Sequence, residues 1–127
     1  MWETTRLALD HIEEFLTGIH QTAEPRRVLA TVLFTDIVSS TQQASRVDLR
    51  LRAGLHTGEV ELRDNDVGGI AVHIAARVMA AARPGEILSS RTVRDLVVGS
   101  DVALESRGSR SLKGVEGRWQ LFAVAER

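Results

Sequence analysis

The chain has 127 residues, and its 16 basic and 17 acidic side chains leave a formal net charge of −1. A chain of this length builds one domain that buries about two-thirds of the surface of its unfolded form, and its balanced charge argues against a nucleic-acid backbone or an anionic membrane as partner. It contains no cysteine, which excludes disulfides and thiolate metal sites. No apolar run reaches the roughly 20 residues of a membrane helix, and no apolar block follows Met1 as in a signal peptide, so we expect a soluble protein of the cytoplasm.

The first 26 residues are predicted to form an amphipathic helix and a linker ahead of a domain of residues 27–127. Apolar residues recur there at three- and four-residue spacing, as on one face of a helix. They are Ala8, Ile12, Phe15, Leu16 and Ile19. The helix is expected over residues 2–17, because Gly18 supplies a stop and Pro25 belongs to the linker.

A strand and a short helix are predicted next. Residues 28–34 are apolar on both faces of the alternation, which is typical of a central strand covered on both sides. The Ser-Ser-Thr run at residues 39–41 offers N-cap candidates for a helix that lasts to about Val47.

Residues 49–62 predict a second strand with one wet face. Apolar and polar residues alternate along it; the apolar set is Leu51, Ala53 and Leu55, and the polar set is Arg50, Arg52 and His56. Gly54 and Gly58 are expected to bend or narrow this strand. Residues 63–66 form a polar turn.

A helix is predicted over residues 70–82, after Gly68 and Gly69 and before Pro84-Gly85. Its buried stripe consists of Ala71, Ile74, Ala75, Val78, Met79 and Ala82. The later elements are a strand over residues 86–89, a helix over 92–98, a strand over 102–106 and a strand over 118–125. Because helices alternate with strands, the fold class is α+β or α/β.

Asp36 is the first candidate for chemistry, because it follows an apolar strand and precedes a Ser/Thr turn. A carboxylate in that place could bind Mg²⁺, which takes one or two carboxylates together with phosphate oxygens. It could equally cap the turn at residues 39–41. The spacing alone leaves both interpretations open.

His73 and Arg77 are four residues apart on the predicted helix and therefore share a face. An arginine held on a rigid helix could stabilise charge that develops on a transferred phosphoryl group, whereas a solvated helix face is the plainer interpretation. As a metal ligand, His73 has no histidine or acid at a zinc-like spacing.

Asp66 and Lys113 are two further candidates. Asp66 could accept a hydrogen bond from the exocyclic amino group of a base, or it could serve the turn at residues 63–66. Lys113 lies in a turn next to Gly114, where it would contact a phosphate in a cleft or keep the surface soluble.

Six blocks of the sequence, taken in order, resemble the catalytic domain of the class III nucleotidyl cyclases, the adenylate and guanylate cyclase family. They are FTDIVSST, LRAGLHTGEVE, DVGGIAVHIAARV, PGEILSSRTV, ALESRGSRSLKGV and WQLFAV. The resemblance implies a ferredoxin-like α+β domain. It also implies the family's reaction, in which the ribose 3′-hydroxyl attacks the α-phosphate and pyrophosphate leaves, assisted by two divalent ions, Mg²⁺ or Mn²⁺.

The resemblance assigns roles to the nucleotide-binding candidates. Arg77 matches the arginine that stabilises the transition state, and His73 stands where the family usually has an asparagine. Asp66 matches the position that helps to choose the purine. Lys113 matches the lysine that holds the nucleotide phosphates.

The metal site implied by the resemblance is incomplete. Asp36 matches the first of the family's two metal-binding aspartates, and Ile37 the neighbour whose carbonyl faces the metal. The second aspartate and the adenine-contacting lysine belong in the family to a segment that residues 42–49 replace here. We therefore expect an internally truncated domain that loses the second metal and the strand beside residues 28–34. An apolar strand left at an edge recruits another chain, so a dimer of non-family arrangement or a marginally folded domain is expected.

Three functions remain open at this stage. The first is a purine nucleotide cyclase that is weak alone or needs a full-length partner. The second is a pseudoenzyme of cyclic-nucleotide signalling that binds nucleotide weakly or modulates another cyclase domain, as a homodimer or a mixed assembly. The third is an interaction module without a ligand. We favour the second, because losing one member of a cooperating catalytic group costs most of the rate.

The N-terminal segment resembles a connector from an upstream domain to a cyclase module, or is an ordinary packing helix.

Overall fold

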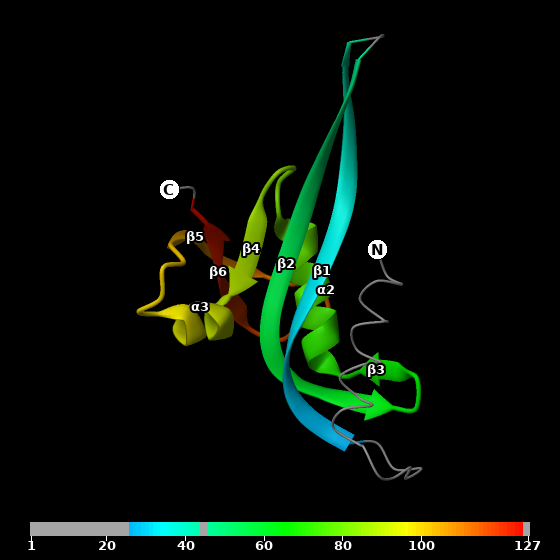
Figure 1. The fold of residues 1–127 in the computed structure, drawn as a ribbon, viewed down its shortest axis with the longest axis vertical. Helices are drawn as coiled ribbons and strands as arrows, with labels where there is room; N and C mark the ends of the chain where they lie inside the picture. Colours follow the sequence, from blue (N-terminus) through cyan, green and yellow to red (C-terminus); the bar gives the residue numbers. More distant parts are fainter. Residues whose placement is uncertain (1–25, 44–45, 126–127) are drawn as a thin grey trace.

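The computed structural model describes residues 26–43 and 46–125, so the predicted helix over residues 2–17 lies outside the described part. The elements in chain order are β1 (Arg26–Gln43), β2 (Arg46–Arg63), β3 (Asp66–Gly68), α2 (Ile70–Ala81), β4 (Ile87–Ser90), α3 (Arg91–Val97), β5 (Leu104–Ser111) and β6 (Arg118–Val124). The strands form one sheet in the order β1-β2-β4-β6-β5, with β3 paired to the end of β2 (Figure 1). The predicted α+β class is confirmed. Within the described ranges, neither helix has the length and apolar character needed to cross a membrane.

Strands β1 and β2 form a long antiparallel ribbon that projects beyond the rest of the sheet (Figure 1). The ladder runs from Arg26 opposite Leu62 to Gln43 opposite Arg46. The predicted helix from residue 39 to about Val47 is therefore wrong. So short a helix is marginal in water, whereas continued pairing of the strands satisfies the backbone groups of both. As a result, Asp36 lies inside a strand and not at its end.

The prediction that residues 28–34 form a central strand is also wrong, because β1 is the edge of the sheet and pairs only with β2 among the described strands. On its second face Leu29 is 76% and Leu33 44% exposed. The edge position is the one expected from the truncated segment between β1 and β2. The apolar pattern on both faces is that of a strand covered on both faces, and among the described residues only the face toward α2 is covered along β1.

The polar face of β2 was predicted to be exposed to solvent, but it is the face that α2 covers. His56 is 4% exposed and lies on the face that packs under α2, whereas Leu51 on the opposite face is 57% exposed. The cause is Gly54, where a Cβ would stand 2.2 Å from the backbone nitrogen of Met79. Two glycines on that face, Gly54 and Gly58, let the helix backbone approach the strand closely, so the helix covers the face that carries them.

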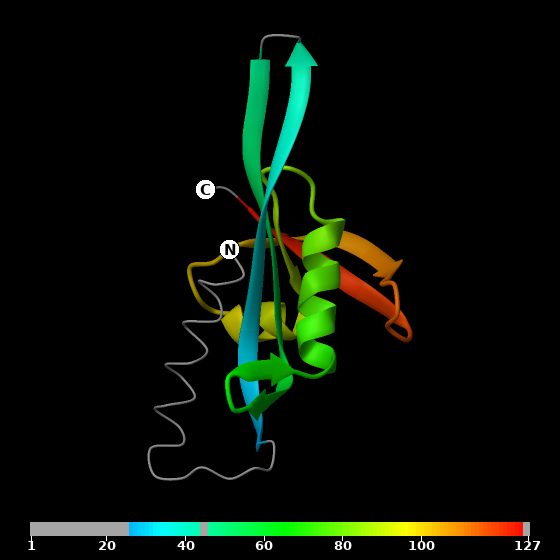
Figure 2. The ribbon, with the colours of Figure 1, turned by 90° about the vertical axis from the view of Figure 1, so that its right-hand side faces the viewer.

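Helix α2 confirms the predicted helix and its stripe, with Ala71, Ile74, Ala75 and Val78 buried against the sheet. Helix α3 packs on the opposite face, where Thr92 Oγ1 donates to the carbonyl of Thr57 at 2.9 Å. The domain is thus a sheet with one helix on each side (Figure 2).

The later elements agree with the predictions to within a few residues, apart from β5. The predicted strand over 102–106 continues to Ser111, although Gly108 interrupts it. The β5–β6 register shifts between Ser106 and Ser109, and Gly108 has a φ of 79°. A glycine in this conformation at a shifted register forms a bulge inside the strand, so the strand continues beyond its predicted end at residue 106.

A directed chain of hydrogen bonds connects His56 to α3. The hydroxyl of Thr92 donates its only proton to the carbonyl of Thr57. Thr92 Oγ1 must therefore accept a hydrogen bond from the hydroxyl of Ser90, whose Oγ is 3.0 Å away. Ser90 must then accept from the Nδ1–H of His56, at 2.6 Å. The ring of His56 also meets that of Trp119 edge-to-face, with centroids 5.7 Å apart. The network therefore selects a neutral imidazole protonated on Nδ1.

Lowering the pH through about 6.5 is expected to destabilise the fold. Burial lowers the pKa of His56 below its ordinary value of 6.5, whereas the unfolded chain takes up a proton near that value. Between the two pKa values the unfolded state binds more protons, so the free energy of unfolding falls with the pH, by up to about 1.4 kcal/mol per pH unit. Urea unfolding at a series of pH values measures this slope. His56→Gln should flatten it and His73→Gln should retain it; a slope unchanged in His56→Gln contradicts the assignment.

Candidate functional site

Asp36 faces α2 and forms an ion pair with Arg52, directly opposite on β2. Arg52 donates to Asp36 Oδ2 from Nη2 at 3.0 Å and from Nε at 3.3 Å. Its Nη1 lies 3.4 Å from the carbonyl of Ala80 near the end of α2. The pair is partly open to solvent, with side chains 44% and 26% exposed. The predicted metal-binding carboxylate thus already has a cationic partner.

This arrangement does not fit two divalent ions. Within residues 26–39 and 49–125, whose side chains the structure describes, no three side chains of histidine, aspartate and glutamate gather to hold a metal. A cation at Asp36 would have to displace Arg52 or share the carboxylate with it. The role predicted for Ile37 belongs to its backbone carbonyl; its side chain lies on the opposite face of β1 and is 57% exposed.

His73 contacts the backbone of Lys113. His73 Nε2 is 3.0 Å from the carbonyl oxygen of Lys113, at the start of the loop between β5 and β6. The next residue, Gly114, has a φ of 79°, and a Cβ there would stand 2.9 Å from the same nitrogen. Leu112 is 5% exposed and anchors the loop in the core. The loop is therefore held against the first turns of α2, with the Lys113 side chain exposed.

Arg77 follows His73 by one helical turn on the same flank of α2 and is half-buried. Within the part of the chain that the structure describes, its side chain forms no ion pair. Arg77, His73 and the Lys113 loop therefore present two cationic groups around one side of α2. Such a flank suits an anionic ligand.

The other predicted residues are not brought to this flank. Arg52, the partner of Asp36, reaches α2 at the carbonyl of Ala80, whereas the Lys113 loop contacts α2 at His73, seven residues or about 10 Å earlier along the helix. Asp66 pairs with Arg63 near the far end of β2, about 36 Å along that strand from Arg52. Its carboxylate accepts a hydrogen bond from the neighbouring amide of Val67 at 2.9 Å, which is turn chemistry.

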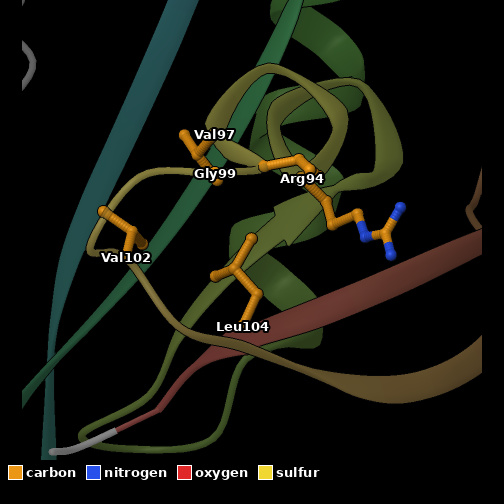
Figure 3. A pocket seen from close by; sticks show the side chains of 6 residues that line it. Arg94, Val97, Gly99, Val102 and Leu104 are labelled. Atoms are coloured by element: carbon orange, nitrogen blue, oxygen red, sulfur yellow. The ribbon is translucent and has the colours of Figure 1, made fainter.

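None of the six predicted residues lines the hollow shown in Figure 3. Its volume is about 170 Å³, and its lining consists of Arg94, Val97, Val98, Gly99, Val102 and Leu104. Pockets for ligands of nucleotide size run from about 300 Å³ upward. The hollow is too small to hold a triphosphate.

The sequence of residues 28–126 matches the adenylate and guanylate cyclase catalytic domain family. The chain belongs to this family. Among its relatives, the pH-sensitive adenylate cyclase MT1302 of Mycobacterium tuberculosis is 33% identical over 106 residues, which cover 80% of this chain and 26% of that protein. An uncharacterized protein of the same species is 39% identical over 77 residues, which cover 58% of this chain and 27% of that protein. The matched part of this cyclase-family chain thus spans about a quarter of these relatives.

Solved cyclases share the fold of this family member. The adenylyl cyclase CyaB from P. aeruginosa superposes with a TM-score of 0.60 at 24% identity, over 66% of this chain and 46% of that one. The adenylate/guanylate cyclase/hydrolase from Silicibacter pomeroyi gives a TM-score of 0.58 at 25% identity, over 62% of this chain and 46% of that one. Less than half of each neighbour is matched, which agrees with the direct connection of β1 to β2 in this shortened cyclase domain.

Sequence reasoning missed Arg52 as the partner of Asp36 and missed the hydrogen-bonded role of His56. The signal for Arg52 was its place on the same strand face as Gly54, which the helix approaches. Because this face was predicted to be exposed to solvent, Arg52 was not expected to have a partner there. The contact of His73 with Lys113 depends on the path of a loop, which no periodicity encodes.

Proposed function

We propose that this domain makes no cyclic nucleotide alone and that it acts as a subunit beside another cyclase-family domain. One observation carries the proposal. Asp36 is paired with Arg52 near the end of α2, whereas the Lys113 loop contacts His73 in the first turns of that helix. The carboxylate is therefore already matched by a cation of its own chain, and a partner domain would supply the metal-binding carboxylates beside the cationic flank.

In such an assembly this chain contributes the flank of α2. By the family resemblance, Lys113 would bind the phosphates of a purine nucleoside triphosphate, and Arg77 would stabilise the charge that develops as pyrophosphate leaves. A preorganised cation suits this role because it needs no rearrangement during the reaction. The partner would supply the carboxylates for Mg²⁺ or Mn²⁺, since the residues at Asp36 do not fit a pair of such ions.

The contact between His73 and the Lys113 loop favours one alternative, an interaction module without a ligand. His73 Nε2 already has a hydrogen-bond partner in the loop carbonyl. It is therefore not available to orient a ribose in the way that the family's asparagine does. Under this alternative, neither nucleotide nor metal would bind.

An activity assay distinguishes these functions. The purified chain is incubated with ATP or GTP and Mn²⁺, alone and mixed with a complete cyclase domain whose own transition-state arginine is replaced by alanine. We expect no cyclic product from either component and product from the mixture. The proposal fails if the chain alone forms product in a manner that Asp36→Ala abolishes. Calorimetric titration with a non-hydrolysable ATP analogue completes the test. Binding heat that appears in the mixture and with neither component by itself excludes the interaction module without a ligand.

A further inference from the structure

The face of the β1–β2 ribbon opposite α2 carries a continuous apolar surface. We call this surface the open face; its exposed residues are Leu29 (76% exposed), Leu33 (44%), Ile37 (57%), Leu49 (65%), Leu51 (57%) and Ile87 (42%). The register makes it continuous, since Leu33 is opposite Leu55, Ile37 is opposite Leu51, and Ala53 lies beside Ile87.

The open face has the character of an unfinished core. Between its aliphatic side chains stand the hydroxyls of Thr31 and Thr57, and these satisfy each other at 2.7 Å. The charged residues Arg27 and Glu59 lie at one end and form an ion pair with N–O distance 3.6 Å. Helix α3 covers the neighbouring part of the same face, where Thr92 bonds to the carbonyl of Thr57. A large apolar surface with a polar edge is typical of a docking site.

The chain ahead of Arg26 has the right composition and length to cover this surface. Those 25 residues join β1 directly, and residues 2–17 carry an apolar stripe with Ile12, Phe15 and Leu16 at helical spacing. A helix of that length is about 24 Å long, which matches the roughly 26 Å from Leu29 to Ile37 along the strand. The linker of residues 18–25 reaches up to about 26 Å, enough for the chain to turn back over β1.

We propose that residues 2–17 form a helix that packs its apolar stripe across the open face, beside α3, as part of the same domain. Tethering gives this segment an effective concentration in the millimolar range. A second copy of the chain at micromolar concentration competes with it at a disadvantage. The segment is then a layer of the cyclase-family domain.

The natural absence of cysteine makes the proposal testable by thiol labelling. Leu51→Cys in the full chain places the single thiol on the open face, and Leu96→Cys places it on the outer side of α3, where the residue is 65% exposed. We expect a maleimide to label Cys at 51 about tenfold more slowly than Cys at 96, because a face that is closed in nine molecules of ten is protected by that factor. The protection should not change with protein concentration.

A matched pair of substitutions identifies the covering segment. Phe15→Asp puts a charge in the apolar stripe, whereas Arg6→Asp puts the same charge on the opposite side of the predicted helix. Phe15→Asp should restore fast labelling at residue 51, and Arg6→Asp should leave it slow. Labelling at residue 96 should be equal in both and serves as the control for folding.

Three results would overturn the proposal. One is fast labelling at residue 51 in the chain without further change. Another is protection that grows with protein concentration, which assigns the open face to a second copy. The third is protection that Phe15→Asp does not remove. Should Phe15→Asp unfold the chain, oxidation of the pair Phe15→Cys and Leu33→Cys decides, because an intramolecular disulfide must form there and must not form with Asp10→Cys and Leu33→Cys.

Discussion

Gly54→Ala is expected to cost this domain about 3 kcal/mol of folding free energy or more, which is a large part of the 5–15 kcal/mol of a typical domain. A Cβ at residue 54 would stand 2.2 Å from the nitrogen of Met79, 2.6 Å from its Cα and 2.8 Å from the carbonyl oxygen of Ala75. All three are backbone atoms of α2, so no side-chain rotation relieves the overlap. The helix must move away from β2, and the buried contacts of Ala75 and Val78 weaken with it.

Gly68→Ala is the matched control for this change. Gly68 lies in β3, its φ is not positive, and a Cβ there would have no neighbour within 4 Å. We expect its unfolding midpoint in urea to stay within the range of neutral surface substitutions, about 0.5 kcal/mol. Equal midpoints for the two variants would mean that α2 does not lie on β2 as described.

Arg77→Ala is expected to lower product formation in the mixed assembly about 100- to 1,000-fold, the usual effect of removing one preorganised group that stabilises transition-state charge. Arg77 has no ion-pair partner among the described residues, so its cation is available to a ligand. The measurement is the rate of cyclic-product formation with the chain in excess over the arginine-deficient partner.

Arg83→Ala supplies the control for charge alone. Arg83 is exposed just beyond α2, and its backbone nitrogen donates a hydrogen bond to Glu86 Oε1, which the substitution keeps. The rate should change little. An equal loss in both variants would reduce the role of Arg77 to a contribution to the general field of the protein, and an unchanged rate in Arg77→Ala would remove it from the site.

Local sequence predicts the elements of this fold better than it predicts their neighbours. The stripe of α2 and the stops around it are properties of one segment, and the helix begins and ends as expected. Whether β1 is central or an edge depends on strands elsewhere in the chain, and its apolar alternation does not report which of them are present. The face of β2 under the helix was reversed for the same reason, since glycine removes bulk without changing the polarity pattern of Arg52 and His56.

The candidate residues illustrate the same division. Asp36, Arg77 and Lys113 were named from the sequence, yet which of them lie together depends on the ion pair of Asp36 with Arg52 and on the path of a single loop. A motif specifies side-chain chemistry, and the topology of the fold determines which motifs lie close together. In a shortened member of a family, the motifs can persist after the chain that joined them into one site has gone.

The relay from His56 through Ser90 to Thr92 has a mechanical consequence. This chain of hydrogen bonds begins beneath α2 and ends on α3, so it passes the carboxyl end of β4 from one side of the sheet to the other. Apolar contacts allow neighbouring layers to shift by small amounts. Hydrogen bonds with fixed donors and acceptors tolerate little relative movement of the elements that they join. The two helices should therefore move as a single rigid body, and any bending of the molecule will concentrate in the protruding ribbon.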